Sequence, residues 1–139
     1  MKIALDAMGG DLAPQATVQG ALNALGQTED ELNVILVGDE DQIKNELGNS
    51  IPDGISIFPT SEVVTMHDNG SKVIKSKPNS SLVQGVQLVK EAKADAFISA
   101  GHTGAVMATS LFLLGRIPHV KRPCLGAYLQ TKNGGKIIC

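Results

Sequence analysis

Residues 5–14, with the sequence LDAMGGDLAP, decide the fold of this chain. In this stretch an apolar strand over residues 3–5 changes into a helix through the adjacent glycines Gly9 and Gly10. Adjacent glycines adopt backbone angles that are closed to other residues, and they let a ligand approach the main chain. In an open α/β sheet, ligands bind at the carboxyl ends of the strands. We therefore expect a binding site at this turn.

Apolar runs typical of strands alternate with helical patterns along the rest of the sequence. The expected strands lie at residues 3–5, 32–37, 55–58, 96–99, 124–129 and 136–139. The expected helices lie at residues 18–25, 39–47, 82–89 and 104–114. Strands that alternate with helices of this size predict βαβ units and a mostly parallel sheet. Near-continuous apolar strands such as residues 34–37 also fit a sheet that is buried on both faces.

The composition is that of a folded domain. The chain has 139 residues, of which 42% are hydrophobic and 19% charged, and this length allows one domain with a real core. No apolar run approaches the ~20 residues that span a bilayer, and the N-terminus does not resemble a signal peptide. Cys124 and Cys139 lie in apolar strand-like runs without metal-ligand spacing, so we expect both to be buried and reduced.

Charge is distributed unevenly along the chain. Residues 1–68 hold two basic and twelve acidic residues, a net charge of −10, whereas residues 69–139 hold ten basic and two acidic residues, a net charge of +8. This asymmetry has two interpretations: the second half binds an anionic ligand or partner, or the two halves face each other and neutralise. A nucleic-acid partner is not expected, because the four aromatic residues do not alternate with a basic run.

Three segments carry further predictions. The helix at residues 104–114 is apolar all round, which is typical of a helix in the core or in a subunit interface, and it predicts a homodimer. Residues 60–81 are polar and rich in turn-forming residues, and a connection of this length is uncommon unless it is functional or mobile. We expect a mobile flap there, with a short helix near residues 72–75. The strand at residues 136–139 has no cap or turn behind it, so we expect a fragment of a longer protein.

A second strand, glycine turn and helix occupy residues 97–105, with the sequence FISAGHTGA. The first amides of such a helix have no intrahelical partner and carry the positive end of the helix dipole, so they suit an anion. Thr103 is placed to cap this helix, to donate its hydroxyl to a phosphate oxygen, or to do both. Because both glycine turns follow parallel strands, we expect them to build one pocket at the same edge of the sheet.

Motifs for several other chemistries are not found. The sequence has no G-x-G-x-x-G at the first turn, no G-x-x-x-x-G-K-[ST] and no G-x-S-x-G elbow, so a dinucleotide fingerprint, a P-loop and a serine nucleophile are not supported. Direct attack by phosphate on a thioester needs no protein nucleophile. The protein then has to position the phosphate and stabilise the oxyanion that develops. Backbone amides, hydroxyls and a few cations suffice, and neither a metal nor a cofactor is expected.

Several motifs resemble the bacterial phosphate acyltransferases of phospholipid synthesis, the PlsX family. They are LDAMGGD at 5–11 with AP at 13–14, LVGD at 36–39, SS at 80–81, SAG at 99–101 with TGA at 103–105, and LGRI at 114–117 with RP at 122–123. These motifs follow the order and spacing of that family over essentially the whole chain, which is similar to the N-terminal portion of its longer members.

The resemblance implies both a fold and an activity. The implied fold is a three-layer α/β/α Rossmann-like sandwich, related to isopropylmalate dehydrogenase and phosphotransacetylase, in which residues 1–139 form the N-terminal part of a single catalytic domain. The implied reaction converts acyl-[acyl-carrier-protein] and inorganic phosphate to acyl phosphate, and the implied enzyme is a homodimer.

Three features depart from the family pattern. His102 stands where the family usually has asparagine; both side chains donate a hydrogen bond, but histidine also titrates near neutral pH. Gly70 and the run KSK at residues 75–77 stand where the family commonly has a proline and three consecutive basic residues. The glycine-rich turns expected after the last strand lie beyond Cys139, so catalysis by this fragment alone is not expected.

These arguments assign the candidate site. The residues predicted to take part in catalysis are Asp6, Lys75, His102 and Thr103. The residues predicted to bind substrate are Gly9, Gly10, Asp11, Lys77, Ser80, Ser99, Gly101, Gly104, Arg116 and Arg122. The expected partners are inorganic phosphate, an acyl carrier protein, a second copy of the chain and a downstream membrane acyltransferase. The expected location is the cytoplasm, with the full-length enzyme peripheral at the membrane.

Structural roles compete with some of these assignments near the N-terminus and the flap. Asp6 and Asp11 either orient the glycine turn or pair with a cation of the pocket. The structural alternatives are a turn residue for Asp6 and an ordinary helix N-cap for Asp11. Ser81 and Gln84 form an S-x-x-Q capping box, which leaves Ser80 freer to act as a donor.

The basic residues and the function itself also allow a second interpretation. Arg116 caps the C-terminus of the apolar helix, while Lys121 and Arg122 form a docking rim for an acidic carrier protein. His67 and His119 are expected to be exposed. Two further functions stay open: a non-catalytic phosphate- or nucleotide-binding α/β module, and a phosphotransacetylase-like enzyme that uses acyl-CoA.

Overall fold

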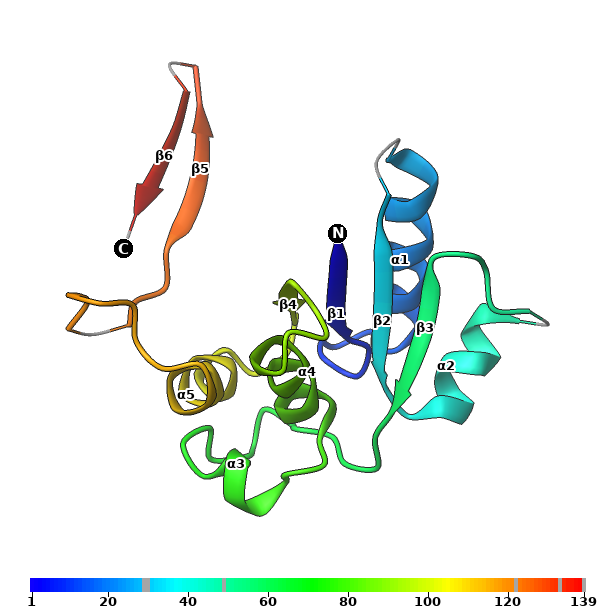
Figure 1. The fold of residues 1–139 in the computed structure, drawn as a ribbon, viewed down its shortest axis with the longest axis horizontal. Helices are drawn as coiled ribbons and strands as arrows, with labels where there is room; N and C mark the ends of the chain where they lie inside the picture. Colours follow the sequence, from blue (N-terminus) through cyan, green and yellow to red (C-terminus); the bar gives the residue numbers. More distant parts are fainter. Residues whose placement is uncertain (29–30, 49, 122, 133, 139) are drawn as a thin grey trace.

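The structure is a computed structural model, and it describes residues 1–28, 31–48, 50–121, 123–132 and 134–138 (Figure 1). The elements in chain order are β1 (Lys2–Asp6), α1 (Gln15–Gln27), β2 (Asn33–Gly38), α2 (Glu40–Leu47), β3 (Ile55–Pro59), α3 (Val73–Ser76), α4 (Ser81–Lys90), β4 (Ala96–Ile98), α5 (Thr103–Leu113), β5 (Ala127–Thr131) and β6 (Gly134–Ile138). No helix in the described ranges is both long and apolar enough to cross a membrane.

Four strands form one parallel sheet in the order β3-β2-β1-β4. The chain builds outward from β1 through β2 to β3, and then crosses back to place β4 on the other side of β1. The strand order therefore reverses between β1 and β4, and in open α/β sheets ligands bind in the crevice at such a point. The predicted α/β class and the parallel sheet are confirmed.

Helices cover both faces of this sheet. Because side chains alternate along a strand, Val34 and Leu36 of β2 pack on one face with Val18 of α1 and Ile43 of α2. Val37 points to the other face, where it packs with Leu88 of α4. Both Leu36 and Val37 are 0% exposed, so the prediction of a strand buried on both faces is confirmed.

The α5 helix is covered on one side only. It packs on α4, and its Ala105 joins a buried cluster with Val73 and Leu82. On its other side Met107 is 40% exposed and Phe112 is 69% exposed. The helix is therefore not buried all round within this chain, and its predicted place in a subunit interface stays a prediction.

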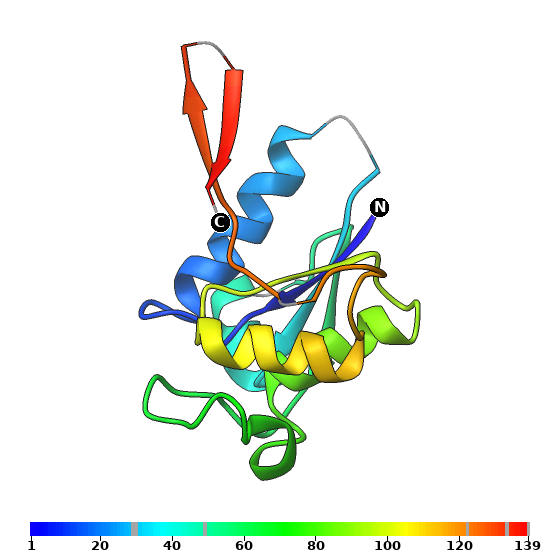
Figure 2. The ribbon, with the colours of Figure 1, turned by 90° about the vertical axis from the view of Figure 1, so that its left-hand side faces the viewer.

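The last two strands depart from the predicted parallel pattern. β5 and β6 pair antiparallel as a hairpin that projects away from the main sheet (Figures 1 and 2). A parallel pair needs a crossover of a dozen or more residues, and only residues 132 and 133 separate these strands. The Asn-Gly pair at 133–134 is a known hairpin signal that our interpretation of the sequence did not use.

The expectation that both cysteines are buried is also wrong where it can be checked. Cys124 is exposed in the segment before β5, because that segment leaves the core after α5 instead of entering the sheet. Cys139 lies outside the described residues.

The segment at residues 60–81 folds back beneath the carboxyl ends of the strands (Figure 1). The short helix predicted near residues 72–75 is present as α3, and Val73 at its start is 0% exposed. The segment thus has an anchor in the core, while its mobility stays a prediction.

Candidate functional site

The two glycine turns lie against each other, because β1 and β4 are neighbouring strands. A Cβ atom on Gly101 would lie 3.2 Å from the Cα atom of Gly9, and one on Gly10 would lie 3.4 Å from the Cβ atom of Ala100. The prediction that both turns meet at the same edge of the sheet is confirmed.

Asp6 and Ser99 connect the two turns by hydrogen bonds. The Ser99 hydroxyl donates to Asp6 Oδ2 at 2.7 Å, and the Met8 amide donates to Asp6 Oδ1 at 3.2 Å. The Gly101 amide donates in turn to Ser99 Oγ at 3.1 Å. Asp6 is 2% exposed and forms no ion pair among the described residues. Its carboxylate orients the turns, which was one of its two predicted roles.

Close packing explains the glycine at position 9. A Cβ atom there would lie 2.5 Å from Asp6 Oδ2 and 2.9 Å from Ser99 Oγ. At Gly10 the requirement is conformational, because its φ of 113° is rarely adopted by residues with side chains. The two glycines therefore serve the same turn for different reasons.

A cavity of about 370 Å³ opens at the first turn. It is lined by Gly9, Gly10, Asp11, Leu12, Ala13, Ala16, Thr17 and Ala100. Asp11 is exposed, and the residue before α1 is Pro14, without a side-chain cap. The structural alternative, Asp11 as the N-cap of this helix, is therefore wrong, and its contact with substrate stays a prediction.

His102, rather than Thr103, caps α5. His102 Nδ1 accepts a hydrogen bond from the Ala105 amide at 3.3 Å, and Nε2 lies 3.1 Å from the carbonyl oxygen of Asp68. A nitrogen that accepts carries no proton, so this geometry assigns the neutral ring with its proton on Nε2, donating to Asp68. Thr103 is the exposed first residue of the helix, and the expectation that it caps the helix is wrong.

The flap has its own ion pair. Lys77 Nζ lies 2.7 Å from Asp68 Oδ2 and donates to the carbonyl oxygen of Val63 at 2.8 Å. The hydrogen bond from Lys77, followed by those from the Thr65 amide and hydroxyl, lowers the pKa of Asp68 to about 2. Lys77 is thus engaged inside the flap, whereas Lys75 is exposed. A substrate contact by either lysine stays a prediction.

Ser80 is a structural residue. It is 0% exposed, its hydroxyl donates to the Lys77 carbonyl oxygen at 2.8 Å, and it caps α4 by accepting from the Val83 amide at 3.4 Å. The interpretation of Ser80 as a freer donor and of Ser81 with Gln84 as the capping box is wrong. Gln84 instead donates to the Pro78 carbonyl oxygen at 2.9 Å. The sequence interpretation placed the cap one residue too late, at Ser81, because both adjacent positions hold serine.

The loop after α5 lies apart from the glycine turns in sequence, but Arg116 lines a cavity of about 730 Å³ together with Thr103 at the start of α5. Arg116 donates to the Lys121 carbonyl oxygen at 3.1 Å, so in this structure it joins two ends of one loop instead of capping the helix. Arg122 lies outside the described residues. His67 and His119 are exposed, as predicted.

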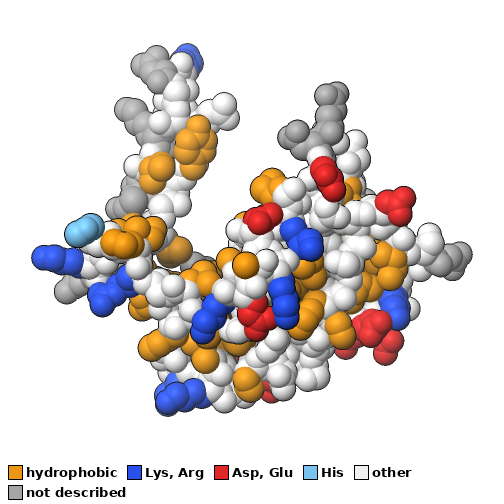
Figure 3. Space-filling model, in the orientation of Figure 1, with side chains coloured by type: hydrophobic (Ala, Val, Ile, Leu, Met, Phe, Trp, Pro, Cys, Tyr) orange, Lys and Arg blue, Asp and Glu red, His pale blue; other side chains and the backbone are white. Residues whose placement is uncertain are grey.

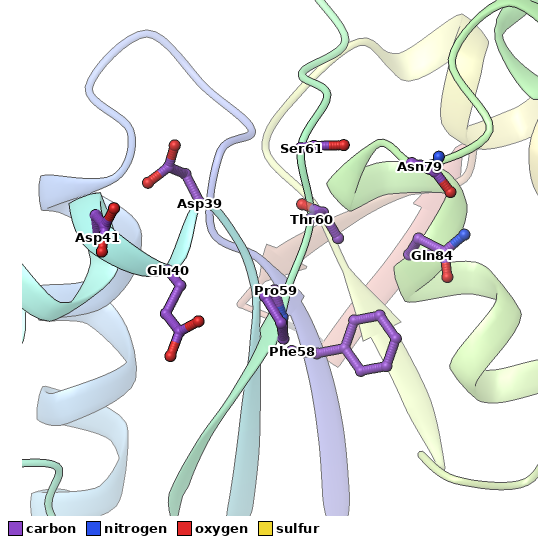
Figure 4. A pocket seen from close by; sticks show the side chains of 9 residues that line it. All are labelled: Asp39, Glu40, Asp41, Phe58, Pro59, Thr60, Ser61, Asn79 and Gln84. Carbon is purple, nitrogen blue, oxygen red and sulfur yellow. The ribbon is translucent and has the colours of Figure 1, made fainter.

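A further cavity, of about 660 Å³ and lined mostly by polar residues, was not predicted (Figure 4). Asp39, Glu40 and Asp41 line one side of it, and Asn79 and Gln84 line the other. Asp39 caps α2, and its hydrogen bonds from Gln42 lower its pKa. The signal in the sequence was the acidic run directly after an expected strand. The negative charge of these three residues makes this cavity unsuitable for binding an anion.

Basic and acidic side chains gather on different sides of the molecule. Acidic side chains cluster near α2, while many lysines and arginines lie toward α3 and the loop after α5 (Figure 3). In the described part of the chain, only the Asp68–Lys77 pair joins the acidic first half to the basic second half. The structure therefore does not favour the interpretation in which the two halves neutralise each other.

Comparisons with known proteins agree with the family resemblance. The family model described as "Fatty acid synthesis protein" matches residues 1–139. Curated relatives named phosphate acyltransferase include those of Halothermothrix orenii, 46% identical, Salinibacter ruber, 45% identical, and Pelotomaculum thermopropionicum, 47% identical, each over 99% of this chain. The chain spans 42%, 41% and 40% of these relatives, respectively. A family match over the whole chain shows that this chain belongs to the fatty acid synthesis protein family.

Proposed function

We propose that this chain provides the phosphate-binding turns of a phosphate acyltransferase, which forms acyl phosphate from acyl-[acyl-carrier-protein] and inorganic phosphate. The observation that carries the proposal is the contact between the turn at Gly9–Gly10 and the turn at Ser99–Gly101. Beside them, a cavity of about 370 Å³ is lined by the glycines of the first turn and lies at a reversal of strand order.

The proposed reaction needs no covalent enzyme intermediate. A phosphate oxygen attacks the thioester carbonyl carbon and forms a tetrahedral oxyanion. When this intermediate collapses, the C–S bond breaks, the carbonyl re-forms, and the carrier leaves as a thiolate that takes up a proton. The turns hold the phosphate and donate hydrogen bonds to the developing charge.

A carboxylate beside bound phosphate is repulsive unless its charge is compensated. The carboxylate of Asp6 is 2% exposed and is bound by the protein itself, because Ser99 Oγ–H and the Met8 amide donate to its two oxygens. We therefore assign Asp6 and Ser99 to positioning of the turns. Contact with phosphate is assigned to Gly10 and Thr103. The Gly101 amide already donates to Ser99 Oγ, so Gly101 is assigned to the close packing of the two turns.

The wider setting follows from the same proposal. The whole enzyme would have a three-layer sandwich of the isopropylmalate dehydrogenase and phosphotransacetylase type, and this chain would form its N-terminal part. The basic side of the molecule would face the acidic carrier protein, and the exposed side of α5 a second copy of the chain. Acyl phosphate would pass to a membrane acyltransferase, which fits a cytoplasmic enzyme peripheral at the membrane.

A chimera tests the proposal. Residues 1–139 replace the matching part of the Halothermothrix orenii relative, and acyl phosphate is trapped with hydroxylamine from acyl-carrier-protein or acyl-CoA. We expect turnover with the carrier-protein donor, and a loss of about 100-fold or more for Gly10→Val, because valine cannot adopt the φ of 113° and blocks the turn. Thr103→Val should lose less, and Thr103→Ser should retain activity.

Two results would contradict the proposal. Full turnover by both Gly10→Val and Thr103→Val would show that the turns do not hold the substrate. An inactive chimera is resolved by titrating the chain itself with inorganic phosphate: chemical shift changes confined to residues away from both turns would place the anion elsewhere.

A further inference from the structure

The flap is a closed loop whose two ends meet. The Asn79 amide donates to Glu62 Oε2 at 2.7 Å, and the Ser81 amide donates to the Glu62 carbonyl oxygen at 3.3 Å. Surface loops whose ends lie close together in this way are compact and frequently functional.

The two halves of this loop are attached differently. The α3 half is anchored, because Val73 is 0% exposed and packs with Leu82 and Ala105. The half at residues 65–70 is attached by polar contacts, since Asp68 binds Thr65 and Lys77 within the loop. This half can therefore move without exposing a core side chain.

Residues 68–70 lie on the first turn of α5. A Cβ atom on Gly70 would lie 2.8 Å from the Ala105 amide nitrogen and 2.8 Å from the Gly104 carbonyl carbon. His102 adds the hydrogen bond from Nε2 to the Asp68 carbonyl oxygen at 3.1 Å. Residues 68–70 thus cover the N-terminus of α5, where our proposed function places the phosphate.

We infer that residues 65–70 form a lid over the N-terminus of α5 and that His102 is the positioning residue that holds the lid closed. One ring nitrogen keeps the helix capped while the other holds the lid, so the hydrogen bond to Asp68 can break without fraying the helix. Both nitrogens are occupied by the protein, so His102 acts through these contacts and not on the substrate. The inference rests on the proposed function in one respect only, namely that the site under the lid binds phosphate.

Hydrogen exchange of the chain, compared with His102→Asn, tests the lid. Asparagine is a strong N-cap, but its shorter side chain does not reach Asp68 while it caps Ala105. We expect the hydrogen-bonded amides of Thr65, Asp68 and Lys72 to exchange about three to ten times faster, from the loss of one hydrogen bond. The Ala7 amide, which donates to Val37 in the sheet, should be unchanged.

A second variant lifts the lid without touching the histidine. In Gly70→Ala the added Cβ meets helix backbone at 2.8 Å, so the lid must move, and the same three amides should exchange faster. The matched controls are His119→Asn, at an exposed histidine whose φ of 69° asparagine readily adopts, and Gly20→Ala, at a helical glycine with nothing within 4 Å.

The outcomes separate the lid from the phosphate site. Equal lid exchange in His102→Asn and His119→Asn overturns the inference, as does an equal rise at Ala7, which would mean that the ring serves overall stability. Adding inorganic phosphate then tests the proposed function alone. If the lid variants behave as expected but phosphate slows no amide at residues 99–105, the lid stands and the phosphate site fails.

Discussion

The parallel sheet and the β5–β6 hairpin are both made of apolar strand sequences, but they differ in what covers them. In β2, Leu36 and Val37 are 0% exposed, because helices lie on both faces of the sheet. In β5, Tyr128 and Leu129 are 68% and 49% exposed, and every residue of that strand is exposed. Apolar strand residues thus contribute to stability according to the neighbours that the tertiary structure provides.

The largest expected effect comes from one substitution made in both regions. Leu36→Ala should lower the free energy of unfolding by about 2–5 kcal/mol, because it leaves a cavity in the core. Leu129→Ala should change it by less than about 0.5 kcal/mol, because the side chain is half exposed. Urea unfolding of both variants measures the difference. Similar losses in the two variants would mean that the hairpin is buried in solution.

A smaller difference in stability is expected between substitutions at Gly9, in the first glycine turn, and at Gly20, which leaves open space for an added Cβ atom. Gly9→Ala should cost about 1–3 kcal/mol, because the added methyl group overlaps Asp6 and Ser99. Gly20→Ala, in α1 with nothing within 4 Å, should instead stabilise the chain by about 0.5–1 kcal/mol. Thermal unfolding checks both signs, and a neutral Gly9→Ala would show that the two turns do not pack as described.

The smallest effect concerns the Asp68–Lys77 pair. The pKa of Asp68 falls from 3.8 to about 2 on folding, so the folded state favours the charged carboxylate. This stabilisation is present above pH 3.8 and is lost as the pH falls toward 2. Unfolding midpoints above and below this window should therefore differ more for the wild-type chain than for Asp68→Asn. An equal pH dependence in both would show that the pair does not form.

The site shows where prediction from sequence stops. The two glycine turns were found because strands, glycines and helices leave local patterns. The capping residues were misassigned, because Ser80 and Ser81, like His102 and Thr103, are adjacent candidates whose choice depends on backbone geometry. The Asp6–Ser99 hydrogen bond joins residues 93 positions apart, and no local sequence pattern predicts a contact over that distance.

By itself, the sequence determined the parallel α/β class, the order of the elements through α5 and the meeting of two glycine turns at one sheet edge. These follow from periodicity, and from the rule that parallel strands end at the same edge. Only the tertiary structure decided that the flap covers the start of α5, that both nitrogens of His102 bind protein, and that the apolar residues of β5 are exposed. Those outcomes depend on contacts between distant segments, whose geometry is set by the packing of the whole chain.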